Sequence, residues 1–232
     1  MNNDFEVFKK EVSWFFKATD EFEVKEDSLK CSNNFKQTFP NMCELISHAR
    51  VLNITHKRGD KVRDYKLLSW GEGASVCGWL CKFENGKTRI ELLKEHQLLL
   101  DNMGGIAASY HQLTYDRELL TNNQTFIFTK SECTRGMEDW IEYYEEVCAD
   151  EEYEMIETDY LLCFAKDKTG NETLYDLKTS EVFLFASEHD FDNVEVLDNQ
   201  PEFTFYTING VTSFVDYAEN LAKQWLERFV NN

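Results

Sequence analysis

The segment formed by residues 138–159 contains eleven carboxylates and no Lys or Arg. Because an unpaired charge is costly to bury, these side chains must face solvent, and only a narrow apolar stripe of the segment can face a core. Trp140, Tyr144 and Val147 recur at helical spacing and supply that stripe. The sequence therefore predicts a surface helix over residues 136–150 whose carboxylates point outward.

The negative charge is concentrated in the second half of the chain. Residues 1–116 carry 17 acidic and 16 basic side chains, a net charge of −1, whereas residues 117–232 carry 26 acidic and 8 basic ones, a net charge of −18. A surface of this kind repels nucleic acid and anionic membranes, and it attracts a basic protein over a Debye length of about 10 Å. The candidate partner-binding residues are Glu138, Asp139, Glu142, Glu145, Glu146, Asp150, Glu151 and Glu152. The alternative is a solvated face that only keeps the protein soluble.

The composition is that of a folded protein. The chain has 232 residues, 42% of them hydrophobic and 14% aromatic, which a disordered acidic chain would not have. Its seven cysteines are an odd number scattered along the chain, which is typical of reduced thiols rather than of a disulfide framework. The N-terminus has no signal-peptide pattern, and no apolar run approaches the roughly 20 residues of a membrane span. We expect a cytoplasmic protein.

Hydrophobic periodicity and turn residues predict an α+β fold. Helices are expected over residues 4–18, 40–48, 89–103 and 136–150, and from Ser213 onward, where Ser213 and Asp216 form a capping pattern. Strands are expected over residues 51–55, 65–70, 76–83, 106–113, 125–129, 160–166, 173–177, 182–187 and 203–208. The polar stretch of residues 19–34 receives no element.

Three sequence pieces occur in an order that resembles a known family. The first is the helix that ends in Asn102-Met103-Gly104-Gly105. The second is the run Leu162-Cys163-Phe164-Ala165-Lys166-Asp167, followed by Gly170-Asn171, Leu174-Tyr175-Asp176-Leu177, Glu181-Val182-Phe183-Leu184-Phe185 and Glu188-His189-Asp190. The third is Ser213-Phe214-Val215-Asp216-Tyr217-Ala218. This order resembles the SUKH superfamily, the domain shared by bacterial immunity proteins and a fungal regulator of cell-wall synthesis.

The resemblance covers about residues 90–230 and implies a fold. It implies a central, mostly antiparallel sheet that contains residues 160–166, 173–177 and 182–187. The helix ending at Gly104-Gly105 and the helix from Ser213 would pack on that sheet. The chain would then divide into residues 1–89, an N-terminal helix with a strand-rich extension or insertion, and residues 90–232, a SUKH-like domain, the whole forming one compact unit.

The sequence has no strong motif for acid–base catalysis or metal binding. Adjacent residues of a strand point to opposite faces, so Glu188-His189-Asp190 is interpreted as a turn or cap rather than an acid–base site. Cys77 and Cys81 lack the C-x₂-C spacing of structural zinc and are interpreted as packed core thiols.

The remaining histidine and basic motifs also have structural interpretations. His96 and His111 are lone histidines, interpreted as structural or exposed. The basic run of residues 57–63 contains Asp60 and is interpreted as a hairpin turn rather than a nucleic-acid site.

These observations favour a non-enzymatic, acidic binding protein that needs no metal or other cofactor. The resemblance implies an immunity protein that neutralises a toxin, and the charge independently favours a basic, nuclease-type toxin domain as the partner. The first alternative is a regulatory or scaffold domain that binds an endogenous protein. The second is a hydrolase that acts on a cationic substrate through paired carboxylates.

Overall fold

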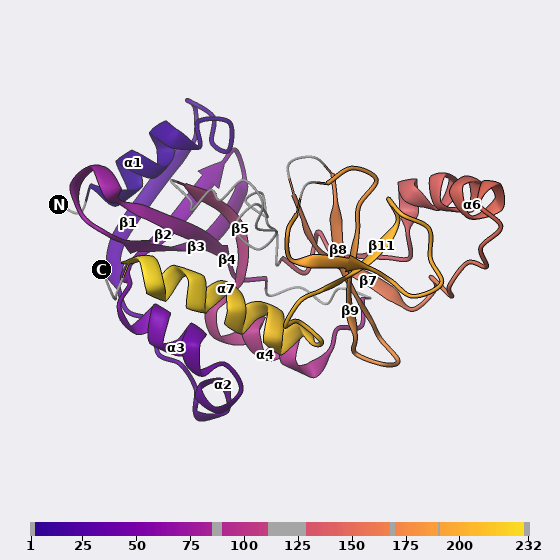
Figure 1. Ribbon diagram of the computed structural model, residues 1–232. Coiled ribbons are helices and arrows are strands. Elements are labelled where there is room, and N and C mark those ends of the chain that lie inside the picture. Colours follow the sequence, from indigo (N-terminus) through magenta and orange to yellow (C-terminus); the bar gives the residue numbers. More distant parts are fainter. Residues whose placement is uncertain (1–2, 85–89, 111–128, 168–169, 190, 230–232) are drawn as a thin grey trace.

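The computed structural model describes residues 3–84, 90–110, 129–167, 170–189 and 191–229. Over this part of the chain, two antiparallel sheets of five and six strands pack with helices, so the predicted α+β class is confirmed. The sheets are separated by a helical layer, and each has a further helix on its outer face (Figure 1). No helix in the described ranges is long and apolar enough to cross a membrane.

The first sheet is an antiparallel meander with the strand order β1-β2-β3-β4-β5. Its strands are β1 (Glu21–Asp27), β2 (Arg50–Arg58), β3 (Lys61–Trp70), β4 (Cys77–Lys82) and β5 (Gly105–Tyr110). Alternation buries both of its faces. In β4, Trp79 belongs to the main core, whereas Leu80 belongs to a second core beneath α1 (Asp4–Glu11).

The helical layer between the sheets forms the main core. It consists of α2 (Asn33–Thr38), α3 (Pro40–Ser47), α4 (Lys94–Met103) and α7 (Phe214–Phe229). The indole of Trp225 on α7 lies 5.2 Å from that of Trp70 and 4.6 Å from that of Trp79, between ring centroids. The expected helix from Ser213 therefore packs against the first sheet as well as the second, which contributes Phe164 and Tyr175 to the same core.

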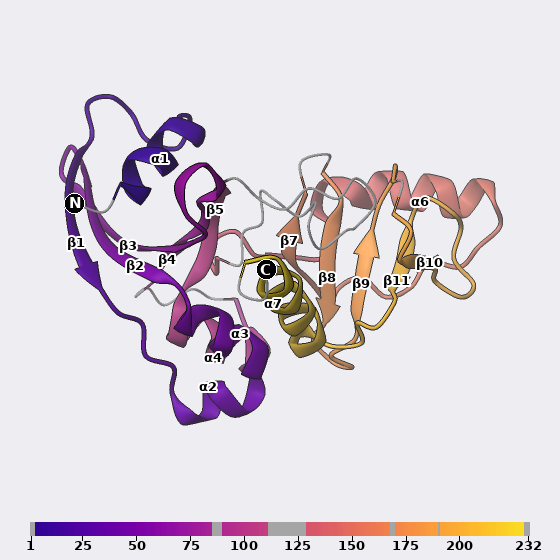
Figure 2. The ribbon, with the colours of Figure 1, turned by 60° about the vertical axis from the view of Figure 1, so that its left-hand side comes forward.

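The second sheet has the strand order β10-β11-β9-β8-β7-β6. Its strands are β6 (Thr134–Arg135), β7 (Leu161–Lys166), β8 (Glu172–Asp176), β9 (Val182–Phe185), β10 (Val194–Val196) and β11 (Phe205–Ile208). The prediction that β7, β8 and β9 share one antiparallel sheet is confirmed. One face of this sheet packs on α4 and α7, and α6 (Ile141–Asp150) covers the other (Figure 2).

Several predicted boundaries are wrong, each for a physical reason. The first helix ends at Glu11 rather than at residue 18, because Phe15 and Phe16 turn to pack on Tyr65. The helix ending before Gly104 begins at Lys94 rather than at residue 89, and the residues from 90 to 93 are extended or irregular.

The polar stretch of residues 19–34, for which no element is predicted, contains the edge strand β1, which is held by its ladder to β2 and by the packing of Phe22 on Phe5 and Phe16. The helix expected over residues 136–150 begins with a 3₁₀ turn at Glu138–Trp140 before α6. The strand expected over residues 125–129 lies almost entirely outside the described residues.

The predicted division at residue 89 does not separate the two sheets. β5 follows α4 in the sequence and returns to pair with β4, so the first sheet takes strands from both sides of the division. Gly104 makes this return possible. Its φ of +76° is in the left-handed region, and a Cβ atom there would lie 2.7 Å from the backbone oxygen of Lys82.

Candidate partner-binding surface

The predicted acidic surface lies on α6 and the residues at both of its ends. The candidate carboxylates whose side chains are described are all exposed: Glu138, Glu142, Glu145, Glu146, Asp150, Glu151 and Glu152. The side chain of Asp139 lies outside the described part. None of these seven carboxylates forms an ion pair with another described residue. The structure therefore brings these seven residues together on α6 and its two ends, without an ion pair to another described residue.

The inner side of α6 explains why this face is held in place. Tyr144 is fully buried and packs on Phe205, with 5.1 Å between ring centroids. Its hydroxyl donates to Gln200 Oε1 and accepts from the Ile156 backbone N–H at 2.9 Å. Gln200 Nε2 in turn donates to the Glu154 backbone oxygen at 3.1 Å. These bonds fix the acidic segment after α6 against the loop between β10 and β11.

Two lysines near this face pair with carboxylates outside the set of seven. Lys166 Nζ lies 2.7 Å from Glu172 Oε1, and Lys178 Nζ lies 2.9 Å from Glu157 Oε2. The Glu172 carboxyl is largely buried, and burial raises its pKa although Lys166 favours the charged form. These two lysines are therefore already paired with carboxylates outside the set of seven, and Arg135 on β6 donates to the Asp159 backbone oxygen at 2.8 Å rather than to one of the seven.

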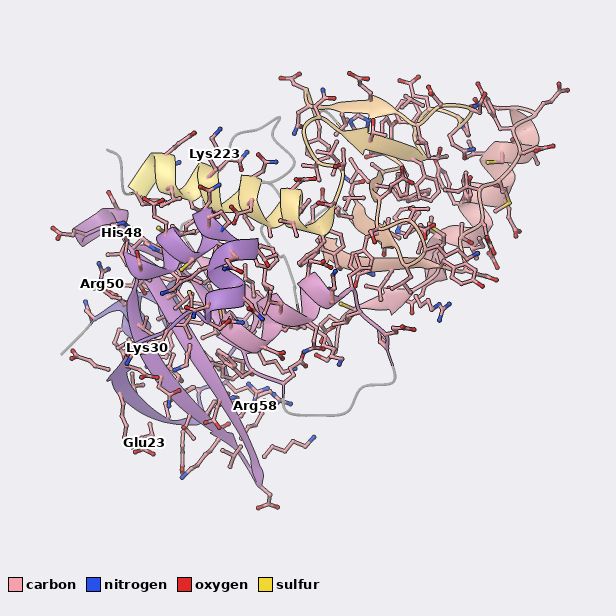
Figure 3. The ribbon with its side chains drawn as sticks, turned by 90° about the horizontal axis from the view of Figure 1, so that it is seen from below. Glu23, Lys30, His48, Arg50, Arg58 and Lys223 are labelled. Carbon is pink, nitrogen blue, oxygen red and sulfur yellow. The ribbon has the colours of Figure 1, made fainter. Side chains whose placement is uncertain are left out.

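The opposite end of the molecule has a different electrostatic character. Figure 3 shows Lys30, His48, Arg50, Arg58 and Lys223 around the first sheet and α7, away from α6. Several cations here pair with carboxylates of the same half: Arg50 with Asp4 at 2.9 Å, Arg58 with Asp20 at 2.6 Å, and Lys66 with Asp27.

The Asp20 pair is the most elaborate of these contacts. Its carboxylate accepts from Arg58 Nε at 2.9 Å and from Arg58 Nη2 at 2.6 Å, and it lies 2.9 Å from His56 Nε2. The guanidinium of Arg58 holds the pKa of Asp20 well below its usual range. The pair joins the turn before β1 to the β2–β3 hairpin, which confirms the interpretation of residues 57–63 as a hairpin turn.

The candidate catalytic motifs have structural roles in the described residues. Cys77 and Cys81 are buried in the main core, as interpreted, and burial raises the pKa of the Cys77 thiol to about 12. His189 Nδ1 accepts from the Phe191 backbone N–H at 3.2 Å, which is a turn contact.

The two lone histidines differ in what the structure describes. His96 is buried and lies 3.1 Å from the Tyr175 hydroxyl, in agreement with its structural interpretation. His111 and Asp190 lie outside the described residues. Within the described ranges, no group of His, Cys, Asp and Glu has the arrangement of a metal site.

Sequence reasoning missed part of the exposed surface beside α6. Phe203 is 45% exposed and lies in the loop before β11, although its sequence position was assigned to a strand over residues 203–208. The turn residues Asp198-Asn199-Gln200-Pro201 precede it and could have placed it in a loop.

Comparison with known proteins gives no match to a family model, to a curated protein or to a solved structure.

Proposed function

We propose that this protein is a non-enzymatic binding protein whose acidic face around α6 binds a basic protein. The partner is a nuclease-type toxin domain, and the protein acts as its immunity protein. The observation that carries this proposal is the set of seven exposed carboxylates without an ion pair among the described residues.

The arrangement on α6 is unfavourable for the isolated protein. Glu142 and Glu145 are three residues apart, and Glu146 and Asp150 are four apart, so like charges face each other on one helix. Each such pair destabilises a helix by about 0.2–0.5 kcal/mol. A solubilising face could mix both signs of charge without this loss, which supports a role in attracting a cationic surface.

A nuclease offers a cationic surface of the required kind. It holds the phosphates of its substrate with Lys and Arg, and those side chains contribute most of its non-specific affinity for nucleic acid. An acidic inhibitor that covers them associates rapidly and excludes the substrate. The resemblance of residues 90–230 to the SUKH superfamily supports the same class of partner, while an endogenous regulatory partner would use the same charge complementarity.

The test is a charge reversal with a matched control. Glu142→Lys with Glu146→Lys changes the net charge from −19 to −15 while leaving the buried Tyr144 untouched. Glu21→Lys with Glu26→Lys makes the same change on the exposed positions of β1 at the opposite end. Association with a purified basic toxin domain encoded next to this gene is measured by stopped flow over a salt series.

The α6 variant is expected to associate about tenfold more slowly and to lose most of its salt dependence, because exposed interface charges act mainly on the association rate. The β1 variant is expected to behave like the unmodified protein. Equal effects of both variants would mean that only the net charge matters. No effect of either would remove α6 from the interface. Tight binding that leaves the nuclease active would favour the regulatory alternative.

A further inference from the structure

Phe203 is an exposed aromatic residue in a loop that is otherwise well anchored. Its two neighbours in the chain differ sharply, since Glu202 is exposed and Thr204 is fully buried. The Thr204 hydroxyl donates to the Pro201 backbone oxygen at 2.6 Å, and Gln200 is held by Tyr144. The loop is therefore fixed on both sides of Phe203, and its ring is left in solvent.

The backbone of Phe203 is in a conformation that a bulky residue seldom adopts. Its φ is +63°, in the left-handed region where Gly and Asn are the common residues. Two tyrosine hydroxyls hold it there. The Phe203 N–H donates to Tyr206 Oη at 2.6 Å, and the Phe203 oxygen accepts from Tyr143 Oη at 3.3 Å. Since Tyr143 belongs to α6, the backbone that carries the exposed ring is tied directly to the acidic helix.

Exposed carboxylates from three parts of the fold lie near this loop: Glu202 precedes Phe203, Glu188 follows Ala186, whose backbone N–H donates to the Thr204 oxygen at 2.9 Å, and Glu151 caps the end of α6. Burial raises the pKa of Tyr143, and the negative charges of Glu151 and Glu188 raise it further. Burial and the charge of Glu202 act in the same direction on Tyr206. Glu151 follows α6, Glu188 follows β9 and Glu202 precedes β11, and all three side chains are exposed. The loop that carries the Phe203 ring therefore has an acidic rim, of which only Glu202 is a neighbour of Phe203 in the sequence.

We propose that Phe203 is the apolar anchor of the partner interface: it enters an apolar pocket on a basic protein, and Glu151, Glu188 and Glu202 pair with Lys or Arg around that pocket. This inference rests on the proposed function and places Phe203 at the centre of the proposed interface. Binding hot spots typically combine a buried aromatic anchor with a surrounding polar rim. The hydrogen-bonded left-handed backbone fixes the direction of the Phe203 Cα–Cβ bond, so no backbone freedom of this residue has to be lost on binding.

Charge complementarity selects a basic protein as the occupant. A second copy of this chain would bring another net charge of −19 to the same surface, and the resulting repulsion opposes self-association through it. A purely cationic surface without a pocket would pair with the carboxylates of the rim but leave the ring of Phe203 exposed. The proposed partner surface therefore needs both cationic side chains and an apolar pocket.

The probe is an amphipathic helical Lys/Leu peptide, compared with an oligolysine peptide of equal charge. Binding is measured by titration calorimetry and mapped by amide shifts in NMR spectra. Phe203→Asn removes the ring but suits the left-handed backbone, so its thermal midpoint is expected to be unchanged or higher. Phe203→Tyr keeps the ring. Trp14→Asn removes another exposed aromatic, 70% exposed at the opposite end, and serves as the matched control.

The protein is expected to prefer the Lys/Leu peptide over oligolysine, with shifts centred on Phe203 and Tyr143. Phe203→Asn is expected to reduce that affinity by at least about tenfold, whereas Phe203→Tyr and Trp14→Asn retain it. Unchanged affinity of Phe203→Asn, or equal affinity of the protein for both peptides, would overturn the anchor.

The outcomes separate this inference from the proposed function. If the charge reversal on α6 weakens binding of both peptides but Phe203→Asn does not, the acidic surface stands and the anchor is wrong. If neither peptide binds, both proposals are wrong. If sedimentation shows a dimer that Phe203→Asn dissociates, the occupant is a second copy and the proposed partner class is overturned.

Discussion

Removing the hydroxyl of Tyr144 should destabilise the protein and loosen the acidic segment after α6. The Tyr144→Phe variant keeps the ring packed on Phe205 but leaves Gln200 Oε1 and the Ile156 N–H without their partner. An unsatisfied buried polar group costs about 1–3 kcal/mol. Gln200 is almost fully buried, whereas Ile156 is half-buried and its N–H can recover a hydrogen bond to water. The combined loss should be about 2–3 kcal/mol.

The assay is urea unfolding followed by tryptophan fluorescence, together with amide exchange at Ile156. For a chain of this length, the expected loss lowers the thermal midpoint by roughly 4–12 °C. Exchange at Ile156 should accelerate more than exchange in β8. The control is Tyr143→Phe, whose hydroxyl makes a longer bond of 3.3 Å near solvent and should cost about 0.5–1 kcal/mol. Equal losses for the two variants would refute the reasoning that Tyr144 fixes this segment.

Three further variants test the fold and its electrostatics. Asp20→Asn should destabilise the protein at neutral pH. Because the folded-state pKa of Asp20 lies below its ordinary value of 3.8, the difference in urea midpoint should persist from pH 7 to about pH 4 and shrink only in stronger acid. Gly104→Ala should lower the free energy of unfolding by more than about 2 kcal/mol, since its Cβ would meet β4 backbone, whereas Gly59→Ala, with open space around it, should lose about 1 kcal/mol. Trp225→Ala should lose about 3–5 kcal/mol in calorimetry, against less than about 0.5 kcal/mol for Trp14→Ala, because only Trp225 is in the core.

Elements with their own local signals could be predicted from the sequence. The last helix begins where Ser213 and Asp216 form a reciprocal cap: Ser213 Oγ accepts from the Asp216 N–H at 3.2 Å, and Asp216 Oδ2 accepts from the Ser213 N–H at 3.0 Å. Pro40 begins α3 because a proline suits the first helical turn. The alternation of Cys77, Trp79 and Cys81 placed these three side chains on the same buried face.

Elements that depend on distant partners could not be predicted in this way. β1 has the sequence Glu-Phe-Glu-Val-Lys-Glu-Asp, and its pairing with β2 and the packing of Phe22 on Phe5 hold it as a strand. The start of α4 also depends on a contact with a residue that is distant in the sequence. The Leu93 N–H donates to the hydroxyl of Tyr175, 82 residues further along the chain, while Leu93 itself is extended. Such contacts leave no periodic signal near the residues that they shape.

The candidate partner-binding surface also has one part that the sequence predicts and another that depends on distant contacts. Exposure of the α6 carboxylates could be predicted, because unpaired charges avoid the core and Tyr144 marks the inner side of the helix. The turn residues 198–201 could place Phe203 in a loop, but its position beside α6 could not be predicted, because it depends on a hydrogen bond from Tyr143, 60 residues earlier. A Phe residue favours a buried position, and a bulky residue avoids the left-handed backbone. An exposed Phe in that backbone is therefore contrary to both preferences.

The pairing of charges across the first sheet indicates which end of the molecule should meet a partner. Asp20 and Arg58 are 38 residues apart, and Asp4 and Arg50 are 46 apart, yet folding brings each pair within hydrogen-bond distance. Folding therefore neutralises much of the charge at that end. The same process leaves the seven carboxylates around α6 without an ion pair, because Lys166 and Lys178 pair with other carboxylates. If the partner is a basic protein, as proposed, this difference favours its approach to the α6 end, near the exposed ring of Phe203.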